Sequence, residues 1–345
     1  MIMPVILLGV TLLIFGMISF LGPNQRVAMY IRDLPRSELQ MDSLIKRYGL
    51  DDPFLVQYWH WLWGQYDEIT DSYEGGILRG NLGYSRSASQ PINDLIARRF
   101  PATAELALIA AGPIIIVGVW LGIIAANNHN KFIDQVARVF SILGYSFPTF
   151  VFALLVLMLF YAKLQWFPPG RMSTWAMLAT SSPDFIWYTN FLTLDSLLNG
   201  RFDIFLDALR HLILPVITLS YLNWALYLRI TRSSMLETLQ QDYITTARAK
   251  GATDRSVVNR HALPNALIPV ITLGGLTIAG LLSGVVITET IFDYPGIGSA
   301  AARAASNLDV ITVLVFTLLT GGILIIANLV VDVAYAFLDP RVRLS

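Results

Sequence analysis

Long apolar runs recur along this chain, and polar stretches separate them. A helix needs roughly 20 predominantly apolar residues to cross the hydrocarbon core of a bilayer. The pattern therefore predicts an all-α membrane protein with about six transmembrane helices. In chain order, the predicted spans are 2–21, 103–126, 139–162, 212–228, 266–288 and 310–331.

The stretch 23–101 differs from these runs, because charged residues are frequent in it. Its residue pattern predicts helices around 37–48 and 53–66. We therefore expect a small folded extracytoplasmic segment between the first two transmembrane helices. The expected divisions of the chain are a first transmembrane helix at 1–22, this segment at 23–101, a core of five transmembrane helices at 102–335 and a cytoplasmic tail at 336–345.

Four prolines lie within or beside the predicted spans. Proline lacks the backbone N–H and clashes with the preceding turn, so it kinks or locally unwinds a helix. The candidate hinge or kink positions are Pro148, Pro215, Pro264 and Pro269. The mixed stretch 163–211 contains a Pro-Pro-Gly turn and aspartates among its apolar residues. We expect its apolar part to lie at the membrane interface and not to span.

A polar and basic stretch, 237–269, lies between the fourth and fifth predicted spans. Gly251 interrupts its helical pattern and is free to take the left-handed conformation that ends a helix. Thr253 and Asp254 can cap a second short helix that runs to His261. The apolar positions of the first helix recur at three- and four-residue spacing: Leu236, Leu239, Tyr243 and Ala247. The pattern predicts two amphipathic helices joined by a glycine turn, an arrangement suited to docking.

Two other interpretations fit the same stretch. A helix, a glycine turn and a second helix also describe a DNA-binding helix-turn-helix, and a solvated loop is the third possibility. Adjacent membrane spans would press the segment against the bilayer, and its acidic residues dilute its positive charge. We therefore favour docking to a cytoplasmic partner over binding to nucleic acid or a solvated loop.

Composition supports a membrane setting and excludes several kinds of chemistry. Hydrophobic residues make up 55% of the chain and charged residues 14%, and the formal net charge is zero, so no general attraction to nucleic acid is expected. The absence of cysteine excludes disulfides and thiol chemistry. No lysine follows a glycine, so the Gly-Lys-Ser/Thr phosphate loop is missing, and the histidines lack metal-ligand spacing. We expect neither an enzyme active site nor a metal site.

Positive charge sets the expected orientation, because Lys and Arg accumulate in cytoplasmic loops. The loops that we assign to the cytoplasm carry ten Lys or Arg, and the two opposite loops carry five. This bias places both termini and the loop at 232–265 in the cytoplasm. The ten are Lys131, Arg138, Arg229, Arg232, Arg248, Lys250, Arg255, Arg260, Arg341 and Arg343, and the five are Lys163, Arg171, Arg201, Arg210 and Arg303.

Few polar residues occur in or at the ends of the predicted spans. Such residues usually face the helix bundle or a wet cavity, so Asn223, Asn328 and Glu289 are candidates for a translocation pathway. Hydrogen bonding between helices is an equally open alternative. One possible function for such a chain is that of a stand-alone secondary transporter, which would need paired intramembrane carboxylates or broken helices for ion coupling. The predicted spans carry almost no charge, so this function is a remote alternative.

The docking stretch QDYITTARAKGATDRSVVNRHALPNALIPVIT resembles the cytoplasmic coupling loop, or EAA loop, of bacterial ABC import permeases. More narrowly, nearly the whole chain resembles the permease subunits of dipeptide and oligopeptide importers. The other matching motifs are RYGLDDPFLVQYWHWL (47–62), GNLGYS (80–85), RRFPATAELAL (98–108), HLILPVITLS (211–220), ETIFDYPGIG (289–298) and LDPRVR (338–343). The chain departs from the family pattern after its first span, where Gly22-Pro23-Asn24 replaces Pro-Gly-Asp-Pro. Related permeases also carry oligosaccharides, so peptides, oligosaccharides and other small solutes all remain possible.

The resemblance implies a type I ABC importer permease that crosses the plasma (inner) membrane of a bacterium or archaeon several times and has both termini in the cytoplasm. In such an importer, two homologous permease subunits lie in the membrane lipid and together enclose the translocation pathway. Two cytoplasmic ATPases hydrolyse ATP, and an extracytoplasmic binding protein delivers the solute. The chain itself is then expected to hold no cofactor, because ATP and Mg²⁺ are bound by the ATPases. The coupling helix that docks onto an ATPase is expected to comprise Asp242, Tyr243, Thr246, Ala247, Arg248, Ala249, Lys250 and Gly251.

Overall fold

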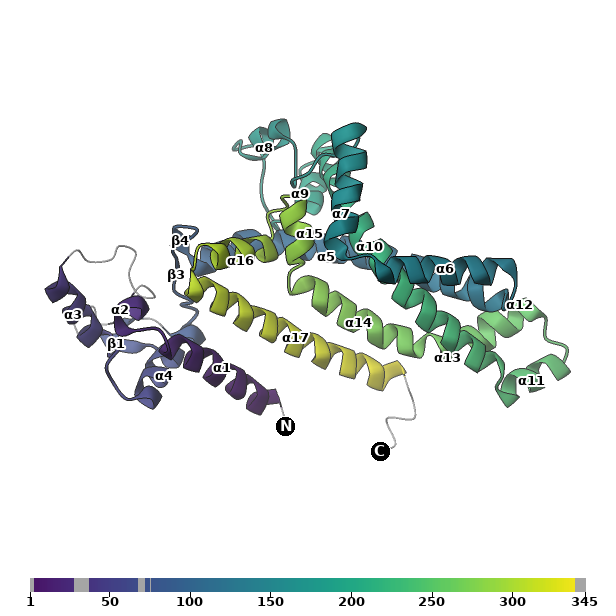
Figure 1. Cartoon of the computed structure of the whole chain (residues 1–345), viewed down its shortest axis with the longest axis horizontal. Helices are drawn as coiled ribbons and strands as arrows, with labels where there is room; N and C mark the ends of the chain where they lie inside the picture. Colours follow the sequence, from purple (N-terminus) through teal and green to yellow (C-terminus); the bar gives the residue numbers. More distant parts are fainter. Residues whose placement is uncertain (1–2, 28–36, 68–71, 75, 339–345) are drawn as a thin grey trace.

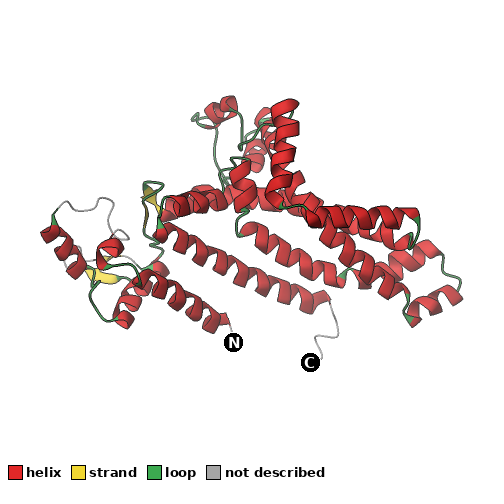
Figure 2. Cartoon of the chain, viewed as in Figure 1, coloured by secondary structure: helices red, strands yellow, loops and turns green. Residues whose placement is uncertain are grey.

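The computed structural model describes residues 3–27, 37–67, 72–74 and 76–338, and long helices dominate it. Figure 1 shows these helices running along the longest axis of the molecule. Figure 2 shows that the strands are short and confined to the N-terminal part. The main helices are α1 (Met3–Ser19), α5 (Ile92–Asn127), α6 (Phe132–Ser146), α10 (Phe202–Leu239), α14 (Ile268–Leu282) and α17 (Val310–Leu338). The predicted all-helical fold class is confirmed.

The bundle is built on the contact between α5 and α10. Glycines on α5 allow it: a Cβ on Gly118 would lie 2.5 Å from Cβ of Tyr227, and a Cβ on Gly122 would lie 2.5 Å from Cβ of Thr231. Small residues let helix backbones approach closely in this way. The Tyr227 hydroxyl donates a hydrogen bond to Thr277 Oγ1 on α14 at 2.8 Å. Tyr227 therefore joins three helices in the largest apolar core.

Two of the described helices are long and apolar enough to cross a membrane, α5 and the Val310–Val331 part of α17. Two bent pairs bring the number to four if each pair forms one span: Phe132–Gly144 with Thr149–Lys163, and Asp254–Ala266 with Ile268–Leu282. α1 is a shorter apolar helix, and the predicted fourth span lies within the 38-residue helix α10. The count of six therefore stays a prediction.

The candidate hinge prolines differ in their surroundings. Pro148 lies between α6 and α7 (Thr149–Leu157), and the helices on either side of this break are bent by 98°. α7 continues into a π-helical segment, Met158–Lys163. In contrast, α10 runs on through Pro215. Pro264 lies near the end of the continuous helical stretch Asp254–Ala266, whose last part is α13 (Leu263–Ala266), and Pro269 lies in the first turn of α14; these two helices are bent by 49°.

A small folded segment lies between α1 and α5. The predicted helices at 37–48 and 53–66 are confirmed as α3 and α4, and α4 packs on α1 through Trp61, Tyr58 and Phe15. The strands were not predicted. Its elements are α2 (Pro23–Arg26), α3 (Glu38–Arg47), α4 (Phe54–Trp63), the antiparallel strands β1 (Gln65–Asp67) and β2 (Ser72–Glu74), the 3₁₀ turn Ile77–Arg79, and the antiparallel strands β3 (Tyr84–Ser85) and β4 (Gln90–Pro91).

Two of the expected boundaries differ from the structure. The expected division at 101/102 falls inside α5, which begins at Ile92. The helix starts early because Ile92 and Leu95 are buried against α16 and α17, and this packing favours continuous helix through Pro101. At the other end, α17 extends to Leu338, and the rest of the expected tail, 339–345, lies outside the described residues.

One end of the bundle is completed by short helices. Figure 1 shows α7 and α8 projecting to the top of the view, away from the long helices. Residues of α8, α9 and the start of α10 share a separate apolar core that includes Ala176, Leu192 and Ile204. The short helices are α8 (Thr174–Thr180), α9 (Leu192–Leu198), α15 (Val286–Ile291) and α16 (Ile297–Ser306). The opposite end of the bundle carries α11 (Asp242–Ala249), α12 (Asp254–Ser256) and a π-helical segment, Val257–Ala262.

Candidate functional site

The predicted docking stretch folds as two short helices around a glycine turn. α11 ends before Gly251, whose φ is +83°, and the Gly251 N–H donates to the carbonyl of Arg248 at 2.9 Å. Thr253 then caps α12, because its hydroxyl accepts a hydrogen bond from the Ser256 N–H at 3.4 Å. The left-handed glycine and the threonine cap are both confirmed.

α11 is held on the bundle by one side chain. Ile244 is 0% exposed and packs in a cluster with Met235 of α10, Val257 and Ala262. Tyr243, which the periodicity placed on the apolar face, is 43% exposed. The sequence analysis missed Ile244 as the anchor, although it is the most apolar residue of this helix.

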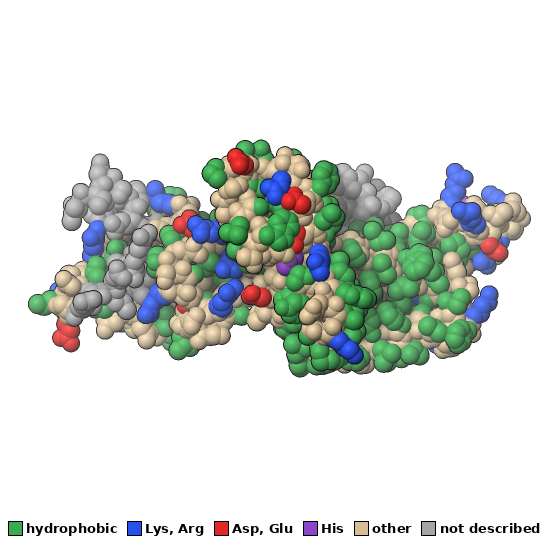
Figure 3. All heavy atoms as spheres, turned by 90° about the horizontal axis from the view of Figure 1, so that it is seen from above, with side chains coloured by type: hydrophobic (Ala, Val, Ile, Leu, Met, Phe, Trp, Pro, Cys, Tyr) green, Lys and Arg blue, Asp and Glu red, His purple; other side chains and the backbone are tan. Residues whose placement is uncertain are grey.

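The other face of α11 is open. Among the predicted docking residues, Ala247 is half-buried and the remaining seven are exposed: Asp242, Tyr243, Thr246, Arg248, Ala249, Lys250 and Gly251. Figure 3 shows Lys and Arg side chains gathering at this end of the molecule, on the right of the view. We call α11, the turn and α12 the coupling element.

A groove of about 500 Å³ lies beside the coupling element. Arg248 and Asp254 face each other across the turn at 4.0 Å, and both are well exposed, so this pair contributes little to stability. The lining residues come from the ends of α5 and α10 and from both sides of the turn: Ala126, Asn127, Leu239, Arg248, Asp254, Arg255, Val258 and Asn259.

A buried carboxylate ties the neighbouring loop to α10. Arg232 donates from Nε to Oδ1 of Asp134 at 2.6 Å and from Nη2 to Oδ2 at 2.8 Å. Arg138 and the backbone N–H of Asn130 also donate to Oδ2, each at 3.0 Å. The hydrogen bonds from Arg232 are the main reason that the pKa of Asp134 lies well below its ordinary value. The carboxylate is therefore charged at neutral pH, and it ties the start of α6 and the preceding loop to the C-terminal half of α10.

At the opposite end of the bundle, a buried ion pair joins α5 to the segment before α8. Glu105 Oε2 accepts hydrogen bonds from Arg171 Nη2 at 2.7 Å and from Nε at 3.1 Å. Glu105 Oε1 accepts from the backbone N–H and the hydroxyl of Thr193 at 2.6 and 2.7 Å. The sequence analysis placed Arg171 only as a loop charge, because its partner is 66 residues away.

Glu289 occupies a second buried position beside this pair. Thr103 Oγ1 donates to its Oε1 at 2.9 Å, and the Ser299 N–H donates to Oε2 at 2.8 Å. A Cβ on Gly296 would collide with this carboxylate, so the glycine is required there. The Tyr294 hydroxyl donates to Glu105 at 3.4 Å, and the Tyr294 carbonyl accepts from the hydroxyl of Ser299, whose N–H donates to Glu289. In this network Glu289 is 0% exposed, so its carboxylate does not face an open surface of the described chain.

The other two pathway candidates lie elsewhere. Asn223 is half-buried on α10 and donates to the carbonyl of Leu219, one turn earlier in the same helix, at 2.7 Å. Asn328 is exposed on α17. Within the described residues, no hydrogen bond joins either asparagine to Glu289. The structure therefore does not bring the three candidates together.

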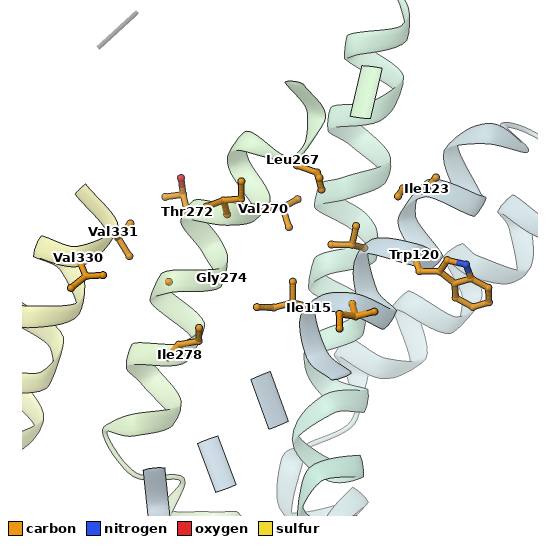
Figure 4. A pocket seen from close by; sticks show the side chains of 14 residues that line it. Ile115, Trp120, Ile123, Leu267, Val270, Thr272, Gly274, Ile278, Val330 and Val331 are labelled. Atoms are coloured by element: carbon orange, nitrogen blue, oxygen red, sulfur yellow. The ribbon is translucent and has the colours of Figure 1, made fainter. Parts of the chain in front are cut away.

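An apolar cavity of about 610 Å³ lies between α5, α14 and α17. Figure 4 shows its lining side chains, among them Ile115 and Trp120 of α5, Val270 and Ile278 of α14, and Val331 of α17. Apart from Thr272 and the glycines, the lining is hydrophobic. None of the predicted pathway residues contributes to it.

The part of the chain that the structure describes holds a Ser-His-Asp cluster and no cluster of metal ligands. It contains no group of three or more His, Asp or Glu placed to hold a metal ion. Ser173, His211 and Asp207 do meet, but Asp207 Oδ1 accepts directly from the serine hydroxyl at 2.6 Å. In a hydrolase triad the histidine stands between the serine and the aspartate. Here the three side chains anchor the projecting segment to α10.

Comparison with known proteins defines the class. Residues 118–344 match the family described as binding-protein-dependent transport system inner membrane component. Residues 2–107 match the N-terminal family of the same transport system membrane components. The chain therefore belongs to the binding-protein-dependent transport system inner membrane components, and the predicted resemblance is confirmed.

Curated relatives cover almost the whole chain. It is 40% identical over 337 residues to the di/tripeptide transport system permease protein DppB of Pseudomonas aeruginosa, covering 97% of this chain and 94% of that protein. It is 37% identical to the probable D,D-dipeptide transport system permease protein DdpB of Escherichia coli K12, with 97% and 93% covered. It is 33% identical to the oligopeptide transport system permease protein AppB of Bacillus subtilis, with 98% and 95% covered.

Proposed function

We propose that this chain is a permease subunit of an ATP-driven importer and that the imported solute is a peptide. The observation that carries the proposal is the coupling element: an exposed helix and turn, fixed to the inner end of the bundle by Ile244. The relatives described above are named as permeases for dipeptides, tripeptides and oligopeptides. This favours peptides over oligosaccharides as the solute.

In the proposed assembly, a second, homologous permease completes the translocation pathway. Two cytoplasmic ATPases bind ATP and Mg²⁺, and an extracytoplasmic binding protein delivers the peptide. The coupling element docks onto one ATPase. Because Ile244 shares an apolar cluster with Met235 of α10 and with Ala262 and Ala266 of the helical stretch that leads into α14, a displacement of α11 is passed to α10 and to that stretch. Rigid-body movement of these helices then opens the pathway to one side at a time.

ATP is expected to be bound only in the assembly. The purified chain alone should neither bind nor hydrolyse ATP, because it lacks a phosphate loop, whereas the complex with its ATPases should do both. Nucleotide binding is measured by equilibrium dialysis and hydrolysis by phosphate release, followed by uptake of a labelled dipeptide into proteoliposomes. Stoichiometric nucleotide binding by the isolated chain would contradict the proposal.

The proposed orientation predicts which residues an impermeant reagent can reach. Thr245→Cys lies on the exposed face of α11. It should remain unlabelled by an impermeant maleimide in intact spheroplasts and react after the membrane is opened, because the charge bias predicts that α11 is in the cytoplasm. Ser43→Cys on α3 is the matched control and should react in both states. The chain has no native cysteine, so each signal has one source. Labelling of Thr245→Cys in intact spheroplasts would show that the orientation is the reverse of the proposed one.

A further inference from the structure

Two arginines stand on either side of the contact between α5 and α16. The contact is apolar: Leu95 of α5 is buried with Ile297 and Ala300 of α16. Arg99 follows Leu95 by four positions, and Arg303 follows Ala300 by three, so each lies on the helix face that makes the contact. The packing of the two helices therefore brings two guanidinium groups together at the outer end of the bundle.

Neither charge is neutralised by a direct partner within the described chain. Arg99 is half-buried, and its charge is opposed by that of Arg303 and attracted by Glu289 and Asp293. No carboxylate forms an ion pair with either arginine among the described residues. Glu289 and Asp293 attract the charge of Arg99, but neither carboxylate lies within ion-pair distance of it among the described residues. A half-buried guanidinium without a counterion is costly, and a bound anion would remove that cost.

The surface around Arg303 is open. α16 reads IGSAAARAAS, so small side chains surround this arginine and none is long enough to cover it. Arg303 is exposed and donates from Nε to the carbonyl of Ser299 at 3.4 Å. Figure 3 shows Lys and Arg side chains gathering over α16 and the outer end of α5, to the left of the projecting segment. An anion can therefore reach Arg303, and Arg99 keeps part of its surface exposed beside it.

We propose that Arg99 and Arg303 bind a carboxylate at the outer end of the bundle, and that it is the C-terminal carboxylate of the incoming peptide. The assignment of the ligand rests on the proposed function. A guanidinium presents parallel N–H donors that match the two oxygens of a carboxylate, and every unmodified peptide ends in one. Arg99 is recessed between two helices, which suits one small anionic group better than a broad protein surface. The site would orient the peptide as it enters the bundle.

The test uses the complete complex in proteoliposomes, with the binding protein added already loaded and at saturating concentration. Uptake of a labelled dipeptide is compared with uptake of the same dipeptide as its C-terminal amide. Arg303→Gln and Arg99→Gln should lower uptake of the free peptide by about tenfold relative to wild type, as expected for loss of one charge-assisted hydrogen bond. Uptake of the amide should change less than about twofold, because the amide lacks the anion.

Matched variants separate recognition from folding and from general charge. Arg98→Gln removes one positive charge from the neighbouring exposed position of α5 and should leave uptake of both peptides unchanged. Arg303→Lys keeps the charge and should restore part of the uptake that Arg303→Gln loses. Association of the binding protein with each complex is measured by co-sedimentation and should be unaltered.

Three results would overturn the inference. Equal loss for both peptides, or weakened association of the binding protein, would mean that the arginines contact the binding protein instead. Unchanged uptake by Arg303→Gln and Arg99→Gln would mean that they bind no carboxylate. Failure of the wild-type complex to import any peptide is a different outcome, because it would reject the proposed function together with the ligand assigned here.

Discussion

Gly251→Val should abolish peptide uptake while ATP hydrolysis by the complex continues. Gly251 has a φ of +83°, and a β-branched residue is strongly disfavoured there. A Cβ at this position would meet nothing within 4 Å, so the cost is in the backbone, roughly 1–2 kcal/mol, and not in a collision. Ile244 keeps α11 attached to the bundle. The turn therefore relaxes by changing the angle between α11 and α12, and the coupling element no longer fits the ATPase. Uptake and phosphate release are measured on the same proteoliposomes.

The chain offers a closely matched control for this substitution. Gly80 also has a φ of +83° and open space around its Cβ position, but it lies in the N-terminal folded segment. Gly80→Val should thus carry the same backbone cost and leave the ratio of uptake to hydrolysis unchanged. Gly251→Ala should be milder than the valine variant, because alanine is not β-branched. Normal uptake by Gly251→Val would show that this turn does not transmit movement.

Glu105→Gln should destabilise the protein by about 3–5 kcal/mol, because it leaves the Arg171 charge without its counterion. The Arg171 side chain is 11% exposed and that of Glu105 is 2% exposed, so water cannot replace the lost partner. The substitution also weakens the link from α5 to Thr193. Thermal unfolding of the detergent-solubilised protein, followed by tryptophan fluorescence, measures the effect.

Two comparisons test whether burial is the cause. In the exposed pair Arg201–Asp203, Nη2 lies 2.7 Å from Oδ2. In the buried pair Arg171–Glu105, Nη2 lies at the same distance from Oε2. Asp203→Asn should therefore barely change the unfolding temperature, since exposed ion pairs contribute little. The double variant Glu105→Gln with Arg171→Met should be more stable than Glu105→Gln alone, because it removes the unpaired charge. Equal effects for the buried and exposed pairs would refute the argument.

The features that could be predicted from the sequence are those with local causes. Apolar run length predicts helices that can cross a membrane, since the bilayer requires a certain length of apolar helix. The coupling element was predicted because a glycine that must take positive φ and a threonine that caps a helix act within a few residues. Ile244 was missed as the anchor because which side of α11 faces α10 depends on how the two helices pack.

The start of α5 shows how packing overrides a local signal. Pro101 and the charges before it favour a boundary, yet the helix begins at Ile92 because Ile92 and Leu95 are buried against α16 and α17. The break at Pro148 was expected as a kink. Its extent, a bend of 98°, depends on the packing of α7 against α10 and α15.

By itself, the sequence determined that this protein is an all-helical membrane protein of a known transport family and where the helix–glycine–helix stretch that resembles a coupling loop lies. Only the tertiary structure decided which charges meet. Arg171 reaches Glu105 across 66 positions, and Arg232 reaches Asp134 across 98. Arg99 and Arg303 come together only because α5 packs on α16. Residue spacing predicts neighbours within one helix, but pairs between helices depend on how the helices pack in three dimensions, which no local pattern encodes.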